Sequence, residues 1–436
     1  MSELCKGYKR TNAGILPEDW SSTILGEVAT IKARIGWRGL KASEYTKSGP
    51  YLIAGKHIRG SKILWDKCDH LSMERYEESK EIQIREKDVV ISKDGTIGRA
   101  AYIDKLPGLT TINGTMMLVR ADDKNLIGQF IYYFFQGDKF QSLVKERISG
   151  SSIPHLFQKD MINFNIPLPS IEEQQKIAKI LSTVDTQIEQ TEQLIEKTKE
   201  LKKGLMQQLL TKGIGHTEYK ESELGHIPSS WEIKFLNDIS NIKGGKRLPK
   251  GVDLVEENTG YPYLRIVDMG KGKILFDNIQ YIPADIAPKL VNYRIYSGEI
   301  YITVAGALLG LVGMLPEKLD GINLTENADR ICDITINNFY LEHYLKGGYI
   351  QNQISNVRTV NAQPKLSLEQ IRNFKILIPP LDEQQKIADI LSTVDSEIES
   401  YEQEKAKYEE LKKGLMQQLL TGKIRVENRL ISKKTL

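Results

Sequence analysis

The sequence has few cysteines, no dominant charge and no long apolar run. Cys5, Cys68 and Cys332 are odd in number and far apart, which argues against a disulfide framework or a zinc ribbon and favours a reducing cytoplasm. The longest apolar stretch, at 302–315, is interrupted by three glycines and is shorter than the roughly 20 residues that a spanning helix needs. No apolar run follows the N-terminal charges, so we expect no signal peptide and no membrane contact.

Motifs for catalysis are also missing. There is no GxxxxGK[ST] phosphate loop for ATP hydrolysis, no GxGxxG between a strand and a helix, and no Asn-Pro-Pro-aromatic stretch of the adenine methyltransferase kind. The six histidines show no HExxH or other metal-ligand spacing. The sequence therefore predicts no catalytic residue, no metal site and no cofactor in this chain.

The balance of charge excludes a generally basic surface. Against 57 acidic residues the chain carries 60 Lys and Arg, a formal net charge of +3. If nucleic acid is the partner, the basic surface must be local.

One long stretch of the sequence occurs twice. Residues 173–210 read EQQKIAKILSTVDTQIEQTEQLIEKTKELKKGLMQQLL, and residues 383–420 read EQQKIADILSTVDSEIESYEQEKAKYEELKKGLMQQLL, without a gap between the copies. Positions from Ile177 and from Ile387 onward, at alternating steps of four and three, form the seam of a helix that packs lengthwise on another. Neither copy contains proline, so we expect two long helices that pair as an antiparallel coiled coil.

The repeat extends into the regions before each helix, which open on YKRTNAGILPEDW and YKESELGHIPSSW. Trp20 and Trp231, which end these segments, are predicted to anchor the core of each domain. Strand and helix patterns follow in the same order in both copies, so we expect an α+β fold with pseudo-twofold symmetry and a nearly circular arrangement. The predicted parts are a domain at 1–170, a helix at 171–212, a second domain at 213–380, a second helix at 381–425 and a tail at 426–436.

In each domain an apolar strand follows the tryptophan and leads into a glycine-rich basic loop, IKARIGWRGLK in one copy and IKGGKRLPK in the other. Arg and Lys fork onto guanine edges or neutralise phosphates, and glycines let the backbone come close to a duplex. A solvated basic face has a similar composition, but recurrence at matching sites favours DNA binding. The residues expected to contact DNA are Lys32, Arg34, Trp37, Arg38, Lys41, Lys56 and Arg59 in the first copy and Lys243, Lys246, Arg247 and Lys250 in the second.

A second glycine-rich segment, at 85–103 and again at 297–315, predicts two strands around a turn. Lys93 and Arg99 in the first copy have no charged counterpart in the second. A phosphate cradle that both copies require would keep its charges, so we interpret the glycines as turn residues.

The ends of the two helices show apolar residues on more than one side. These residues are Leu205, Met206 and Leu209 in the first copy and Leu415, Met416 and Leu419 in the second. Two interpretations remain open for them, docking of a partner subunit and packing against the neighbouring domain.

The two-copy order, the EQQKIA start of each helix, its LSTVD turn and its LKKGLMQQLL end resemble the specificity subunit of type I restriction–modification systems. The resemblance covers nearly the whole chain. It implies a non-catalytic protein whose two domains are target-recognition domains, each reading one half of a bipartite site in double-stranded DNA. It also implies that the coiled coil spaces the domains and docks two methyltransferase subunits, with translocase–endonuclease subunits completing the enzyme.

The same resemblance implies that S-adenosylmethionine, ATP and Mg²⁺ are bound by those partner subunits. The basic loops at Gly36–Lys41 and Gly244–Lys250 fall where members of this family approach DNA. Because the loops differ in sequence, we expect the two half-sites to differ. Two alternatives are a coiled-coil scaffold that spaces protein-binding modules without DNA, and the recognition half of a fused enzyme, which would need an added catalytic region.

Overall fold

The computed structural model describes residues 6–33, 42–150, 154–270, 272–360 and 364–426. The internal contacts divide the chain into two compact units. Unit 1 is formed by residues 1–191 and 403–436, and unit 2 by residues 192–402. Each unit holds one globular domain and parts of both long helices, and each is described by itself.

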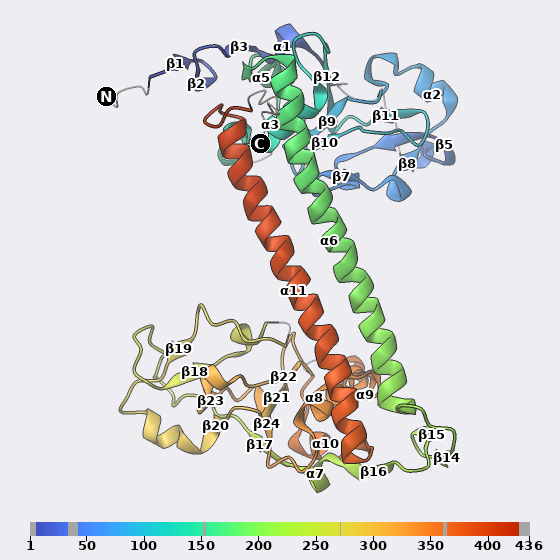
Figure 1. Cartoon of the computed structure of the whole chain (residues 1–436), viewed down its shortest axis with the longest axis vertical. Coiled ribbons are helices and arrows are strands. Elements are labelled where there is room, and N and C mark those ends of the chain that lie inside the picture. Colours follow the sequence, from blue (N-terminus) through green and yellow to red (C-terminus); the bar gives the residue numbers. More distant parts are fainter. Residues whose placement is uncertain (1–5, 34–41, 151–153, 271, 361–363, 427–436) are drawn as a thin grey trace, which may run out of the picture. The chain divides into compact units, whose positions relative to one another are not determined.

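The two long helices coincide with the repeated sequence. Helix α6 spans Ile171–Lys212 and helix α11 spans Leu381–Leu419 (Figure 1). Every position of the predicted seam is buried or half-buried, and Ile177 and Ile387 are fully buried. The seam predicted from the steps of four and three is therefore confirmed.

Within each unit the two helices lie antiparallel, and matching ion pairs join them. In unit 1 the ammonium of Lys412 lies 2.7 Å from Oδ1 of Asp185. In unit 2 the ammonium of Lys202 lies 2.6 Å from both carboxylate oxygens of Asp395. These residues correspond at the repeat offset, so each helix supplies the lysine in one unit and the aspartate in the other.

Helix α11 ends at Leu419, earlier than the predicted boundary at residue 425. Gly422 has φ +68°, a left-handed conformation that ends a helix, and its N–H bonds the carbonyl of Leu419. In the first copy the corresponding glycine is Gly213, one residue later in the repeat, and α6 continues to Lys212. The order Thr-Gly-Lys instead of Thr-Lys-Gly therefore shortens the second helix.

Unit 1 is built on antiparallel strands covered by short helices. Its main sheet has four strands in the order β10-β9-β12-β4, and a smaller sheet has the order β11-β5-β8. Strand β3 pairs with β13, which leads into α6. The strands are β1 Tyr8–Thr11, β2 Gly14–Pro17, β3 Ser21–Ile24, β4 Ala29–Lys32, β5 Thr46–Ile53, β6 Ile58–Arg59, β7 Lys62–Ile63, β8 Asp69–His70, β9 Val89–Ser92, β10 Ala100–Tyr102, β11 Thr110–Ile112, β12 Met116–Ala121 and β13 Asn165–Leu168. The helices are α1 Leu25–Val28, α2 Met73–Glu77, α3 Gly128–Gln136, α4 Asp138–Ser149 and α5 Gln158–Ile162.

Unit 2 repeats this arrangement. Its main sheet has the order β17-β24-β21-β22, and the second sheet has the order β19-β18-β23-β20. The strands are β14 Tyr219–Ser222, β15 Gly225–Pro228, β16 Glu232–Phe235, β17 Asn241–Gly244, β18 Pro262–Leu264, β19 Gln280–Tyr281, β20 Arg294–Ile295, β21 Ile300–Thr303, β22 Val312–Met314, β23 Ile322–Leu324, β24 Ala328–Cys332 and β25 Lys375–Ile378. The helices are α7 Leu236–Ile239, α8 Asn338–Lys346, α9 Gly348–Val360 and α10 Leu368–Arg372. Helices and mostly antiparallel sheets together give the predicted α+β class.

The core of each unit lies between the main sheet and the helix that follows it. In unit 1, α3 packs against β9, β10 and β12, and Phe130 and Ile131 are fully buried there. In unit 2, α8 occupies the same place, and Tyr340 and Leu341 are fully buried. These aromatic segments have helical apolar spacing because one face must cover a sheet. The opposite face of the main sheet of unit 1 is covered as well, since Val90, Ala101 and Leu118 belong to a second buried core that includes the smaller sheet. The ends of the strands lead into loops.

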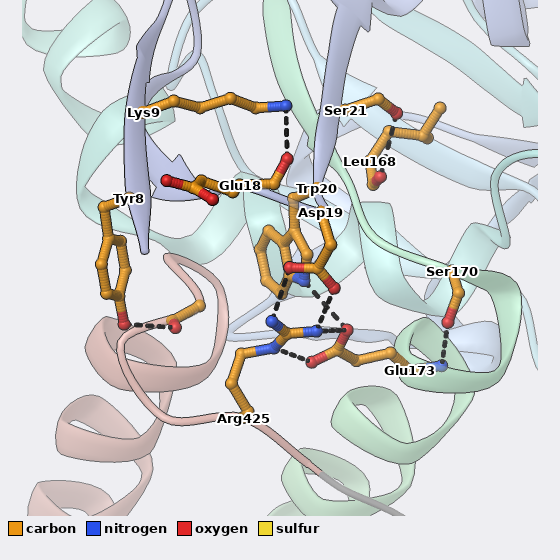
Figure 2. Close-up of polar contacts among 11 residues, drawn as sticks. Tyr8, Lys9, Glu18, Asp19, Trp20, Ser21, Leu168, Ser170, Glu173 and Arg425 are labelled. Atoms are coloured by element: carbon orange, nitrogen blue, oxygen red, sulfur yellow. Dashed lines mark hydrogen bonds and ion pairs between the residues drawn. The ribbon is translucent and has the colours of Figure 1, made fainter. Parts of the chain in front are cut away.

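A charged cluster joins the segment between β2 and β3 of unit 1 to helix α6 and to the segment that follows α11 (Figure 2). The Arg425 guanidinium donates to both carboxylate oxygens of Asp19 at 2.7 and 2.6 Å and to those of Glu173 at 2.9 and 3.0 Å. The indole N–H of Trp20, which is buried as predicted, donates to Glu173 at 2.9 Å. The guanidinium beside Asp19 holds the pKa of that carboxyl below its usual value. We call Asp19, Trp20, Glu173 and Arg425 the clasp.

Unit 2 has the same tryptophan–glutamate contact, completed by a different side chain. The indole of Trp231, also buried, donates to Glu383 at 3.0 Å. The imidazole of His216 lies 2.8 Å from the same carboxylate, and the backbone N–H of Ile214 donates to it at 2.9 Å. His216 belongs to the segment that directly connects α6 to β14. The side chain that completes the contact in unit 2 is therefore close in sequence to the strand β14.

Candidate nucleic-acid interface

In unit 2 one end of the main sheet gathers loops from distant parts of the sequence. The N–H of Gly245, at the start of the basic loop, bonds the carbonyl of Ala328 at the start of β24. The N–H of Val304, after β21, bonds Asn327, and the N–H of Leu366 bonds Val304. The basic loop therefore lies beside three other connections at this end of the sheet, which we call the loop end.

The glycine pair of this loop serves a contact inside the protein. A Cβ on Gly245 would lie 2.0 Å from the carbonyl oxygen of Thr325, which no side chain tolerates. The next residue, Lys246, donates its N–H to Leu324 at 2.9 Å. The approach of these glycines to DNA remains a prediction, and the structure gives Gly245 a further role inside the protein. Its small size lets the loop cross the connection between β23 and β24, which positions the basic side chains that follow.

Those basic side chains project from the anchored loop. Arg247 is 77% exposed, and its Nε lies 2.6 Å from Oε1 of Glu326. Burial alone would raise the pKa of Glu326, but the hydrogen bonds from Arg247 and Thr325 outweigh it and hold the pKa below its usual value. Lys246 lies over the ring of Tyr293 at 5.6 Å, and Lys250 is exposed. Glu326 thus stays ionised among cations.

The other predicted contact in unit 2 lies on a strand. Lys243 is exposed on β17, and its ammonium is 3.9 Å from Asp333, which is also exposed. It stands cross-strand from Arg330 and one residue before the glycine pair. Lys243 therefore lies near the loop end but outside the loop itself.

In unit 1 the corresponding sheet end begins with Lys32, which is exposed at the end of β4. Arg34, Trp37, Arg38 and Lys41, predicted to contact DNA, lie outside the described residues. The N–H of Lys93 bonds Thr115, and the N–H of Leu156 bonds Lys93. These two contacts match those of Val304 in unit 2, so the two loop ends share one backbone frame.

Lys56 and Arg59 come from a neighbouring part of unit 1. Lys56 lies in the short 3₁₀ helix Gly55–His57, and its exposed ammonium is 2.9 Å from Asp69. A Cβ on Gly55 would be 3.5 Å from the Cβ of Ser92, the last residue of β9. Arg59 is exposed on β6. The segment with Lys56 therefore lies beside the loop end, and its contact with DNA remains a prediction.

Three polar side chains at the loop end of unit 1, those of Lys93, Asp94 and His155, were not among the predicted DNA contacts. The Lys93 ammonium lies 2.6 Å from Oδ2 of Asp94, and Nδ1 of His155 bonds Oδ1 of the same carboxylate. Asp94 and His155 also form an isolated β-bridge. The sequence contains a signal for them, because the second copy has no charged counterpart of Lys93. That difference argues against a phosphate cradle shared by both copies, but it is compatible with a role in one copy alone.

A buried carboxylate lies just below the loop end of unit 2. Asp329 on β24 is buried opposite Gly244, and burial raises its pKa to about 6 although Lys365 and Arg372 lower it. The matching residue in unit 1 is Met117, which pairs with Ile91 as Asp329 pairs with Ile302. The two domains therefore differ in polarity inside the sheet as well as in their loops.

The residues considered for subunit docking pack largely onto their own domains. Leu209, Met416 and Leu419 are buried within the cores of units 2, 1 and 1 respectively. Leu205, Met206 and Leu415 are partly buried against the same cores. For the buried residues the structure favours the second interpretation, packing against the neighbouring domain, because no surface is left for a partner.

Two further observations concern the described part of the chain. No group of three His, Cys, Asp or Glu residues there is placed to hold a metal ion. None of its helices is long and apolar enough to cross a membrane.

Comparison with known proteins gives a consistent result. A sequence model of the type I restriction modification DNA specificity domain matches residues 17–200 and again 228–410. The chain is 30% identical over 440 residues to the type I restriction enzyme MjaVIII specificity subunit of Methanocaldococcus jannaschii, covering 97% of both chains. It is 23% identical to the EcoKI specificity subunit of Escherichia coli K12, covering 86% of this chain and 82% of that one.

Solved structures agree at the level of the fold. The S subunit of a type I restriction–modification system from M. genitalium superposes with a TM-score of 0.59 at 19% identity, covering 92% of this chain and 96% of that one. A chain from a structural study of assembly of the type I system gives a TM-score of 0.53 at 18% identity, covering 94% and 99%.

Proposed function

Because the chain belongs to the specificity subunits of type I restriction–modification enzymes, we propose that it reads a bipartite double-stranded DNA target, with one half-site for each domain. One observation supports this most directly. The loop ends of the two main sheets share a backbone frame, established by the contacts of Lys93 and Val304, yet carry different side chains. Matching frames with different chemistry suit two readers of two different half-sites, so the target is asymmetric.

The chemistry of the enzyme is assigned to partner subunits. We propose that a methyltransferase subunit binds S-adenosylmethionine and that a restriction and translocation subunit uses ATP and Mg²⁺. The sequence of this chain has no phosphate loop and no methyltransferase motif, which supports a recognition role alone. The purified chain is therefore expected to bind DNA without modifying it.

We propose that the methyltransferase subunits dock on the exposed face of the segment LKKGLMQQLL. Leu201 and Leu411 are 55% and 49% exposed on this face. Gly204 and Gly414 follow one turn later, and a Cβ on either would meet nothing within 4 Å. Glycine inside a helix costs about 1 kcal/mol relative to alanine, and nothing within the described chain uses the space that it leaves. A close approach by a partner explains the glycine in both copies, and two equal faces imply two equal partners.

Substitution of these glycines tests the docking surface. Gly204→Leu or Gly414→Leu should each leave one methyltransferase per chain, and the double variant none, as measured by native mass spectrometry. Gly→Ala at the same positions is the matched control, since it should stabilise the helix with less obstruction. Full stoichiometry in the double leucine variant would exclude this surface.

The proposed function is tested by co-expressing the chain with the methyltransferase of its system and sequencing the genome for methyladenine. We expect one bipartite motif with two unlike halves and an unread spacer, and no motif when this chain is left out. The scaffold alternative instead predicts methylation that does not depend on this chain and no salt-dependent binding of the chain to duplex DNA.

A further inference from the structure

Each loop end carries one partly exposed carboxylate among its cations. In unit 1 it is Asp94, 34% exposed, at the turn after β9. In unit 2 it is Glu326, 27% exposed, between β23 and β24. The two carboxylates come from different connections but lie at the same end of corresponding sheets.

A carboxylate is costly on a surface that approaches phosphates. Lys and Arg gain affinity there by displacing counterions, whereas an acidic side chain repels the backbone. An ionised carboxylate only accepts hydrogen bonds. In the major groove the matching donors are exocyclic amino groups, N4 of cytosine and N6 of adenine. A carboxylate retained at this place is therefore suited to reading a base.

Both carboxylates are held in position by neighbouring side chains. Asp94 is bound by Lys93 at 2.6 Å and by Nδ1 of His155. Glu326 is bound by Arg247 at 2.6 Å and by the hydroxyl of Thr325 at 3.1 Å. Each carboxylate keeps lone pairs beyond these bonds, since it offers about four acceptor positions. A carboxylate fixed in this way loses little conformational freedom when it meets a base.

Comparison of the two copies separates this arrangement from the requirements of the fold. Since Lys93 and Val304 make the same backbone contacts, Asp94 corresponds to Ala305. In the same frame Glu326 corresponds to Gly114, because the residues after them, Asn327 and Thr115, accept matching hydrogen bonds. The frame forms with either residue at both positions. The carboxylates are therefore not needed to build the loop end.

We propose that Asp94, with Lys93 and His155, and Glu326, with Arg247, are specificity-determining groups that each accept a hydrogen bond from the exocyclic amino group of a cytosine or adenine in one half-site. The inference rests on the proposed function and assigns base readers within it. Lys93 was not interpreted as a phosphate contact in the sequence, and in this proposal its role is to orient Asp94.

The test exchanges each carboxylate for the residue that the other copy has at that position. Asp94→Ala and Glu326→Gly are made in the complex with the methyltransferase, and methylation is measured on a pool of duplexes with each half-site randomised. Each variant should lose roughly ten- to hundredfold discrimination at one base position of one half-site. The other half-site should be unchanged, which also shows that the complex has folded and assembled.

Binding to non-target DNA gives a second, opposite readout. Loss of a negative charge should leave that affinity unchanged or raise it, whereas loss of a structural support should lower binding to all DNA. Asp104→Ala and Glu317→Ala, exposed carboxylates that follow β10 and β22 away from the loop ends, are matched controls and should change neither half-site.

Retention of full discrimination in both variants would overturn the proposal, as would equal loss at both half-sites. Absence of any bipartite methylation in the parent complex would instead contradict the proposed function itself. Asp94→Asn, which keeps one acceptor without the charge, should retain part of the discrimination.

Discussion

The two copies of the repeat secure their first strands to the long helices by different means. In both, a buried tryptophan and a helix glutamate form a hydrogen bond. In unit 2 the additional partner of Glu383 is the imidazole of His216, from the segment that continues directly into β14. In unit 1 the cation on Glu173 is Arg425, which lies 252 residues away and also binds Asp19. In unit 1 the glutamate is therefore bound by a residue that is distant in the sequence, whereas in unit 2 it is bound by a residue of the short segment that leads into the first strand.

The comparison shows which parts of the repeat are fixed by folding and which are free to differ. The tryptophan, the glutamate and the helix lysine–aspartate pair recur because each buries or neutralises a group that the core requires. The side chain that completes the junction differs between the copies, as do the side chains at the loop ends, since several residue types can fill those positions.

The largest effect is expected from making the two copies alike. Replacement of residues 1–170 by a second copy of residues 213–380 should convert the methylated target to an inverted repeat, because both half-sites would then be read by one kind of domain. Sequencing of methylated DNA checks this. The reciprocal replacement of residues 213–380 should give the inverted repeat of the other half-site, and an unchanged site in either chimera would contradict the assignment.

A smaller loss is expected from removing the cations of one loop. The variant with Lys246, Arg247 and Lys250 changed to alanine should bind target DNA about one to two orders of magnitude more weakly at moderate salt, with a reduced salt slope. Methyltransferase docking should be unaffected. Removal of Lys220, Lys234 and Lys318, exposed lysines outside that loop, serves as the control. Equal binding by the loop variant and the parent would make the loop a solvated surface.

The clasp should matter more for stability than its counterpart. Arg425→Ala leaves Glu173 buried with the Trp20 indole as its remaining side-chain donor in the cluster, so we expect a loss of about 1–2 kcal/mol, reduced by partial exposure of the guanidinium. His216→Ala should cost less, because Ile214 still donates to Glu383.

Chemical denaturation measures both losses, and hydrogen exchange locates them. Exchange should increase over β1 to β3 in Arg425→Ala and over β14 to β16 in His216→Ala. Lys423→Ala removes a nearby exposed cation and should have little effect. A larger loss in His216→Ala than in Arg425→Ala would reverse the predicted order.

The buried Asp329 should make the stability of unit 2 depend on pH. The corresponding residue in unit 1 is Met117, which has no titratable group. The folded pKa of Asp329, about 6, exceeds the ordinary value of 3.8, so folding favours the protonated form. The resulting stability is present below about pH 4 and is lost as pH rises through about 6. Asp329→Asn should therefore stabilise the chain by about 1–3 kcal/mol at pH 7.5 and by little at pH 4. Denaturation at both pH values checks this, and a less stable asparagine variant at pH 7.5 would contradict it.

Much of the fold could be predicted from the sequence because the repeat gives two independent views of one pattern. The seam from Ile177 onward and the buried Trp20 and Trp231 follow from periodicity and residue type. The end of α11 was not predicted from the sequence, because the order Gly422-Lys423 in place of Lys212-Gly213 moves the left-handed glycine by one residue. The clasp was also missed, since Arg425 and Asp19 are joined only by the fold.

The candidate site was predicted less completely. The second basic loop lies where its position in the repeat predicted, but the role of Gly245 depends on the carbonyl of Thr325, which is 80 residues away in the sequence. The roles of Asp94 and Glu326 require knowing which strand connections meet at one end of a sheet. Local patterns do not contain that information.

The crowding at Gly245 also sets a rule for redesign of the target. Any side chain at that position would collide with the Thr325 carbonyl and move the whole loop, so a library that randomises it would mostly contain misfolded readers. Arg247 and Lys250, which follow in the same loop, are exposed and have no such constraint on side-chain size. Substitutions at these two positions would change the side chains offered to a half-site without disturbing the loop backbone. Gly245 should be kept as glycine in every member of the library.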